Sequence, residues 1–241
     1  MTMQIGICCA DGSLVLASDT KVRTQERMRV QNEPPETVIH HSKIVFEDRH
    51  NLAVGMAGGG IVGEDATLEL AGHLQSLETI PDSLGPILRD WGNRYFRQHY
   101  PIEVRSASFP VCKMLVVNPN TKYCQLWKLR VNWESTDDCS SRCMVNGNDI
   151  NPAIFWLEYL KADKRPTVED AAGIAAITIG MAAELNPFGV GGLELNEFKD
   201  GKWRHWSQQE LDNSEDGFTA LQDQIRRGIT ALGRPVTPPQ M

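Results

Sequence analysis

The hydrophobic positions at the start of the chain fall into two short runs separated by a polar turn. Residues 4–7 and 14–18 are mostly apolar, and Asp11-Gly12 lies between them. An Asp-Gly pair between two apolar runs is typical of a β-hairpin. In such a hairpin the beginning of the first strand, at Thr2, lies beside the end of the second, at Asp19.

Hydrophobic spacing predicts blocks of strands and blocks of helices over the rest of the chain. A second hairpin is expected over residues 43–46 and 52–57, and its second strand runs into the glycine triplet 58–60. Helices are expected over residues 64–78, 84–100, 151–160, 167–185 and 216–232, and further strands over 111–117, 123–131, 193–198 and 203–206. Antiparallel strands and helices that are segregated in this way predict an α+β fold, a layered sandwich with sheets inside and helices outside.

Local signals add detail at several boundaries. Ser83 is expected to cap the helix over 84–100, and Thr167 is expected to cap the helix that follows it. Residues 21–42 are predicted to form a loop, because the prolines within them cannot donate to a strand ladder. The glycine triplet is compatible both with a flexible turn and with a site where a ligand approaches the backbone.

Composition excludes several classes of function. The chain has 241 residues, of which 41% are hydrophobic, and a net charge of -7. This length fits one domain over residues 1–233 followed by a loose tail over 234–241. Basic residues are dispersed, which argues against nucleic-acid binding, and no apolar run reaches the ~18 residues of a membrane span. No glycine-rich phosphate loop is present, so nucleotide binding has no support.

The cysteines favour a reduced, cytoplasmic setting. Six cysteines are placed too irregularly for a disulfide framework in a chain of this length. Cys139 and Cys143 have a spacing that a metal tolerates, but no second pair of ligands follows, so a loop with two free thiols is expected. Neither a metal nor another cofactor is expected.

The start of the chain carries the candidate chemistry. Thr2 follows Met1 directly, and its small side chain is one that methionine aminopeptidase usually permits. Removal of Met1 would free an α-amine that titrates near ~7.7–8.0 and can accept the proton of its own residue's hydroxyl. Thr2 is therefore a candidate nucleophile whose own α-amine can act as the general base. The hairpin brings the Asp19 carboxylate beside it.

Several motifs occur together over residues 2–77. They are Thr2 opening a strand, Asp11-Gly12, Ala17-Ser18-Asp19-Thr20-Lys21, Lys43-Ile44, and Gly55-Met56-Ala57-Gly58-Gly59-Gly60 before a helix. Together they resemble the proteasome β-type family of N-terminal nucleophile (Ntn) hydrolases, most closely its bacterial homo-oligomeric, Anbu-like members. The resemblance implies a four-layer αββα sandwich and a homo-oligomeric ring or spiral that encloses a peptide or protein substrate. It leaves any unfoldase partner unidentified.

The resemblance also implies catalytic roles. Thr2 would be the nucleophile, Lys43 the cation that lowers the pKa of nearby groups, and Asp19 the acid that holds that cation. The backbone N–H of Gly58 would face the developing oxyanion. For Asp19 or Lys43 alone an ordinary ion pair is the simpler interpretation, and the joint arrangement with Thr2 reverses that preference.

Four further positions acquire expected roles from the same resemblance. Lys21, Met56 and Gly60 would bind the substrate, with Met56 and Gly60 lining its first pocket. Asn148 would be a supporting residue, at a position where many family members have serine. Residues 186–190 replace the acid and the serine that usually support the threonine.

The spacing within the first hairpin leaves an alternative open. The interval from Thr2 to Asp19 is one residue longer than the family pattern, and a bulge near residues 10–11 would absorb the difference. A slip of one residue would instead place Met3 at the catalytic position and make the subunit inactive.

The leading functional hypothesis is a threonine-type peptidase or amide hydrolase that acts through an ester intermediate. A transpeptidase would share the intermediate and resolve it with an amine, and a monomeric small-molecule amidase would share the nucleophile. The contrasting hypothesis is a non-catalytic assembly subunit that keeps the fold. Loss of Met1 favours an enzyme, whereas its retention favours the assembly subunit.

Overall fold

The computed structural model describes residues 2–24, 37–58, 61–100, 110–120, 124–147, 165–186, 189–207 and 209–211. Within these residues the chain forms two five-stranded antiparallel sheets, a two-stranded ribbon and three helices. The predicted α+β class is therefore confirmed. The helices expected over 151–160 and 216–232, and the tail over 234–241, lie outside the described residues.

The first sheet contains the N-terminal strand. Its strands, in spatial order, are β10 (Cys143–Gly147), β1 (Met3–Cys8), β2 (Leu14–Ser18), β11 (Glu194–Lys199) and β12 (Lys202–His205). The first hairpin forms as predicted: Gly12 takes a φ of +87°, and Asp11 Oδ1 accepts the N–H of Ser13 at 2.9 Å. β1 and β2 pair in continuous register without a bulge, and residues 9–13 form the turn between them. β1 is paired along both edges, with β10 and with β2.

The second sheet contains the second predicted hairpin. Its strands, in spatial order, are β5 (Ile44–Glu47), β6 (Leu52–Ala57), β7 (Cys112–Asn118), β8 (Gln125–Val131) and β9 (Thr136–Ser140). The turn between β5 and β6 is held by the Glu47 carboxylate, which accepts the N–H groups of Arg49 at 2.7 Å and His50 at 3.0 Å. β6 ends immediately before Gly58, as the sequence predicts.

The three described helices are α1 (Ile61–Gln75), α2 (Gly85–His99) and α4 (Val168–Leu185). Thr167 caps α4 as expected, because its Oγ1 accepts the N–H of Asp170 at 3.2 Å. The cap predicted at Ser83 is wrong: the N-cap of α2 is Leu84, without a side-chain cap hydrogen bond. The proline in the first turn of α2 lacks the N–H that a cap would satisfy, which reduces the need for one.

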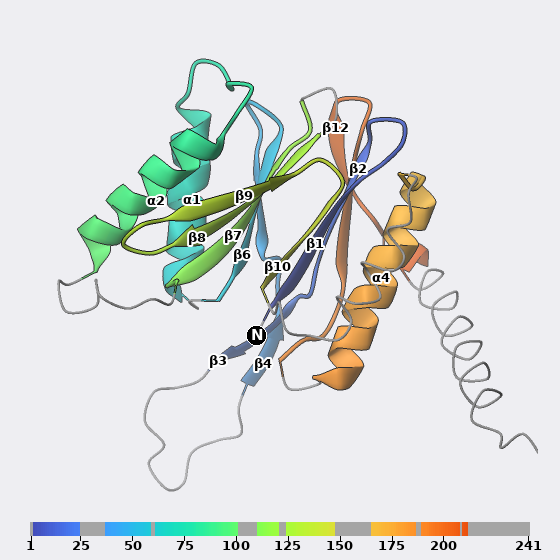
Figure 1. Cartoon of the computed structure of the whole chain (residues 1–241). Helices are drawn as coiled ribbons and strands as arrows, with labels where there is room; N and C mark the ends of the chain where they lie inside the picture. The colour runs from blue at the N-terminus through green and yellow to red at the C-terminus, as the bar shows by residue number, and fades with distance from the viewer. Residues whose placement is uncertain are drawn as a thin grey trace, which may run out of the picture.

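The helices cover the outer faces of the sheets (Figure 1). Apolar clusters hold these layers together. α4 packs on the sheet that contains β1 and β2, through a cluster that includes Met3 and Ile179. α1 and α2 pack on the other sheet, through a cluster that includes Leu70 and Phe96. A third cluster, with Leu16 from β2 and Leu115 from β7, lies between the two sheets. The N-terminal strand is therefore buried on both faces.

Two stretches predicted as loops contain strands. Residues 21–42 begin with β3 (Lys21–Thr24) and end with β4 (Thr37–His40), which pair as an antiparallel ribbon. The prolines of this stretch lie outside those strands, so they do not prevent the pairing. Cys139 lies in β9 and Cys143 in β10, not in a loop, and neither forms a disulfide. β9 is a largely exposed edge strand with polar residues, which is why apolar periodicity misses it.

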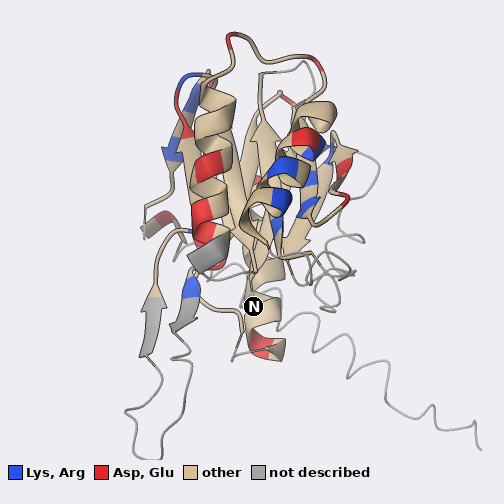
Figure 2. Ribbon diagram, turned by 90° about the vertical axis from the view of Figure 1, so that its left-hand side faces the viewer, with Lys and Arg blue, Asp and Glu red and all other residues tan. Residues whose placement is uncertain are grey.

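Charged residues lie on the helices, on the turns and on several strands, among them β8, β9 and β12 (Figure 2). Behind α1 and α2, the strands in this view are mainly uncharged, as expected for strands that pack between layers. In the part of the chain that the structure describes, no helix is both long enough and apolar enough to span a membrane.

Candidate active site

Thr2, Asp19 and Lys43 lie together between the two sheets. Lys43 Nζ is 3.2 Å from Thr2 Oγ1 and 2.9 Å from Asp19 Oδ2. Thr2 is 8% exposed, Lys43 is 5% exposed and Asp19 is fully buried. The ammonium group thus donates to a hydroxyl and a carboxylate at once, in a place with little access for bulk water.

Strand pairing explains how these residues meet. Asp19 directly follows β2, and the β1–β2 register places it opposite Met3. Its Oδ1 accepts the N–H of Met3 at 2.8 Å, while its own N–H donates to the carbonyl of Met3 at 3.0 Å. Lys43 directly precedes β5, so it reaches Thr2 from the opposite sheet. The site exists only because the two sheets pack face to face.

The register also decides which N-terminal residue faces Lys43. Thr2 Oγ1 contacts Lys43, whereas the side chain of Met3 packs in the cluster beneath α4. Successive side chains of a strand point to opposite faces, so these two positions cannot exchange without shifting the whole strand. The geometry therefore puts threonine, and not Met3, beside the lysine.

Burial changes the protonation equilibria of the charged pair. Loss of water contact lowers the pKa of Lys43 below its ordinary value, although Asp19 opposes the change. The same loss of water raises the pKa of Asp19, against the opposing effects of Lys43 and of the Met3 N–H. Lys43 is consequently a stronger hydrogen-bond donor than a solvated lysine, and it donates to the hydroxyl of Thr2.

Two glycines at the ends of strands take a positive φ. Gly58, at the end of β6, takes a φ of +83°. Gly147, at the end of β10, takes a φ of +106°, and a Cβ there would lie 2.0 Å from the backbone carbonyl oxygen of Thr2. A side chain at position 147 would therefore displace the candidate nucleophile.

The remaining expected site residues are placed only in part. Met56 is buried in β6, and its sulfur lies against Gly63 at the start of α1. Lys21 begins β3, and its N–H donates to the carbonyl of Gly191 at 2.9 Å. Gly60 and Asn148 lie outside the described residues.

A row of buried polar side chains accompanies the site, and no sequence motif pointed to it. We call it the polar row: Asn146, Gln4, Ser18 and Glu194, which are successive register partners on β10, β1, β2 and β11. All four are buried. Polar residues within otherwise apolar strands were the available signal, but their partners are visible only in the folded chain.

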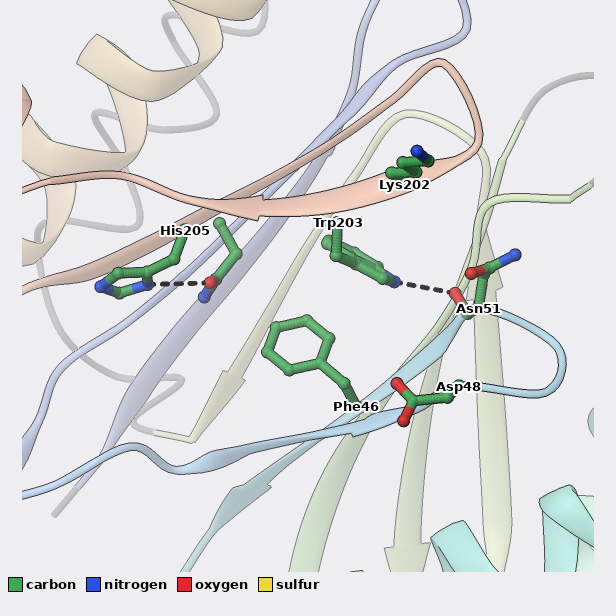
Figure 3. Close-up of a pocket in the computed structure, with 7 residues that line it drawn as sticks. Phe46, Asp48, Asn51, Lys202, Trp203 and His205 are labelled. Carbon is green, nitrogen blue, oxygen red and sulfur yellow. Dashed lines mark hydrogen bonds between the residues drawn. The ribbon is translucent and has the colours of Figure 1, made fainter.

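A pocket lies apart from the three candidate catalytic residues, between the edge strands β5 and β12 (Figure 3). Its aromatic residues are Phe46 and Trp203, and the indole N–H of Trp203 donates to the carbonyl of Asn51 at 2.9 Å. Its polar residues include Asp48 and Lys202. Among the described residues, no group of three or more His, Cys, Asp or Glu side chains is arranged to hold a metal ion.

Comparison with known proteins gives structural matches alone. No protein-family model and no curated protein sequence matches the chain. A structure of an Anbu (Gly-1) mutant from Hyphomicrobium sp. strain MC1 is similar with a TM-score of 0.67 at 12% identity, covering 100% of both chains. Another structure, of Anbu from the same strain, gives 0.63 at 13% identity, covering 99% of this chain and 100% of that one. The expected likeness to Anbu is thus confirmed, and this chain has the Anbu fold.

Proposed function

We propose that this chain is an Anbu-like member of the proteasome β-type Ntn hydrolases and that Thr2 is its nucleophile once Met1 is removed. The observation that carries the proposal is the position of Lys43 Nζ between Thr2 Oγ1 and Asp19 Oδ2 in a buried site. An ion pair with a structural role alone would not need to donate to the hydroxyl at the start of the chain.

The proposed reaction follows from these contacts. Thr2 Oγ1 attacks the carbonyl carbon of an amide and gives its proton to its own α-amine, while Lys43 donates to the developing alkoxide. The backbone N–H of Gly58 is proposed to stabilise the oxyanion. The α-amine then protonates the leaving amine, and the ester on Thr2 is cleaved by water, which returns the hydroxyl.

The substrate is proposed to be a peptide or protein, cut inside a homo-oligomeric ring or spiral in the cytoplasm. The four-layer αββα arrangement and a single domain over residues 1–233 belong to the same proposal. In support, α1 and α2 lie on one sheet, α4 lies on the other, and an apolar cluster lies between the sheets. Lys21, Met56 and Gly60 are proposed to bind the substrate, and Asn148 is proposed to support the catalytic site.

Intact mass measured before and after incubation with a β-lactone or an epoxyketone tests the nucleophile. We expect a parent mass without Met1 that gains a single adduct, and no gain for Thr2→Ala. Thr20→Ala is a matched control, because it removes a nearby hydroxyl that bonds to His40 and not to Lys43. A parent mass that retains Met1 and forms no adduct would contradict the proposal and favour the non-catalytic assembly subunit.

The fate of the ester separates hydrolysis from transfer. A peptide substrate is incubated with and without an added amine, and the products are identified by mass. Free carboxylate in both samples identifies a hydrolase. An amide of the added amine as the main product identifies a transpeptidase that uses the same Thr2 ester.

A further inference from the structure

The polar row contacts two members of the candidate catalytic group, Lys43 and Asp19, and the residue before Lys43. Gln4 Nε2 donates to the carbonyl of Lys43 at 3.1 Å, and Ser18 Oγ donates to the carbonyl of Asp19 at 3.0 Å. Glu194 Oε1 accepts the hydroxyl of Ser42, the residue before Lys43, at 3.0 Å. The row thus connects the sheet that carries Thr2 to the edge that carries Lys43.

Gln4 is the centre of this connection. Its Oε1 accepts the side-chain N–H of Asn146 at 2.8 Å, so the orientation of its amide is fixed from both ends. The amide also lies against Gly55, where a Cβ would come within 2.6 Å of Gln4 Nε2. Gly55 has no side chain, which leaves room for the Gln4 amide against the opposite sheet.

Burying the polar row between two sheets costs free energy, because polar side chains lose their hydration there. Asn146 Oδ1 and Glu194 Oε2 are two of the five buried side-chain atoms that lack a hydrogen-bond partner among the described residues. Each such atom loses hydration and gains nothing in return, whereas apolar residues of similar shape would avoid this cost. Stability alone does not explain these residues, and their shared contacts at Ser42, Lys43 and Asp19 point to positioning.

We propose that Gln4 is a positioning residue that sets the distance between Lys43 Nζ and Thr2 Oγ1, with Asn146 holding its amide. This inference rests on the proposed function. Thr2 and Gln4 are two residues apart, so they face the same side of the strand, towards the opposite sheet. One strand therefore carries the nucleophile and also holds the backbone of the lysine that contacts it.

The test measures the rate of Thr2 labelling by a β-lactone as a function of reagent concentration. Gln4→Met keeps the size of the side chain and removes both hydrogen bonds. Because it leaves the carbonyl of Lys43 without this donor, the variant is less stable than the wild type, and its labelling is compared only where it is folded. We expect the limiting labelling rate to fall about a hundredfold, because small displacements of reacting groups have effects of this size. The reagent concentration at half-maximal rate should stay unchanged.

Asn118→Leu is the matched control. Asn118 is also a buried amide, but it is the last residue of β7, and its Oδ1 accepts the N–H of Asn120. This variant should label at the wild-type rate. If the folded Gln4→Met variant also labels at the wild-type rate, the positioning proposal is wrong.

Gln4→Glu provides a second readout, which a simple packing role would not produce. The neutral acid can donate its O–H to the carbonyl of Lys43, whereas the carboxylate cannot donate and faces that carbonyl as a second acceptor. We expect the ratio of variant to wild-type labelling rates to be highest at low pH and to fall as the new acid ionises. A ratio that does not change with pH contradicts the proposal, and this measurement decides the matter if Gln4→Met does not fold.

The two proposals fail in different ways. If the wild-type chain is not labelled at all, the proposed nucleophile is wrong. If the wild-type chain is labelled and the Gln4 variants behave as the control does, only the positioning role is wrong. Circular dichroism of each variant, recorded at the pH of each assay, shows that the compared chains are folded.

Discussion

Lys43 carries a charge in a place with almost no water, and this determines how the site responds to pH. Burial lowers the pKa of Lys43, so the ammonium loses its proton at a lower pH than a solvated lysine does. In the proposed reaction, the α-amine of Thr2 must lose a proton to act as base, whereas Lys43 must keep one to donate to Thr2 Oγ1. Protonation of the α-amine therefore limits the reaction rate at low pH, and deprotonation of Lys43 limits it at high pH.

We predict a bell-shaped pH profile for Thr2 labelling. The rate should rise as the α-amine deprotonates near about 7.7–8.0. It should then fall before the ordinary lysine value of 10.5, because the pKa of Lys43 is lowered. Lys43→Arg should keep the acidic limb and lose the alkaline one, since arginine stays protonated. A wild-type rate that does not decline below pH 10.5 would contradict the role given to Lys43.

Removing the lysine should also destabilise the fold in a pH-dependent way. Lys43→Met leaves Asp19 buried without its cation, and we expect a loss of about 3 kcal/mol at neutral pH together with loss of labelling. The pKa of Asp19 is raised in the folded state, so the folded chain binds its proton more tightly than the unfolded chain. The stability of Lys43→Met should therefore fall as the pH rises through the raised pKa.

Urea unfolding of Lys43→Met at several pH values measures this effect. The double variant Lys43→Met with Asp19→Asn is the control, because it removes both charges and should recover most of the stability. Its unfolding free energy should lack the additional fall with pH. An identical pH dependence in the single and double variants would show that Asp19 is not its source.

At the level of elements, the end of β10 limits where Thr2 can lie. Gly147→Ala should reduce Thr2 labelling about a hundredfold, because its Cβ would lie 2.0 Å from the Thr2 carbonyl oxygen. Gly201→Ala is the control, since Gly201 also has a positive φ, +78°, but a Cβ added there would meet no atom within 4 Å. It should lose about 1 kcal/mol of stability and keep full labelling. Equal labelling rates in the two variants would contradict this account of Gly147.

The elements that the sequence predicts well are those with local signals. Asp11-Gly12 fixes the first hairpin, and Thr167 fixes the start of α4, because each acts through its immediate neighbours. β9 was missed because its polar, exposed residues have no apolar period. The ribbon of β3 and β4 was missed because the prolines between its strands dominated the prediction.

The candidate site could be predicted only in part, for a related reason. The hairpin itself places Thr2 near Asp19, whereas the pairing of Lys43 with both came from the family resemblance and not from spacing. The polar row depends on register across four strands that are distant in sequence, from Gln4 to Glu194. No local pattern specifies such partners, since they are set by how the sheets pack.

For the whole molecule, the proposed function requires an assembly. Light scattering should give a mass that is a multiple of the 26.9 kDa chain mass. Thr2→Ala should give the same mass as the wild type, because Thr2 lies inside the fold and its hydroxyl contacts Lys43 of the same chain. A monomeric wild type that is still labelled at Thr2 would favour the small-molecule amidase.

The pairing of β1 has a consequence for how the protein is synthesised. Thr2, Asp19 and Lys43 all leave the ribosome early, but β1 is completed by β10, through Met3 and Gly147, and β2 by β11, through Ser18 and Glu194. Such long-range pairing cannot form until the later strands have been made. The position of Thr2, the proposed nucleophile, is therefore not fixed by its neighbouring strands until late in translation, so we expect a nascent chain not to react with the proteins around it.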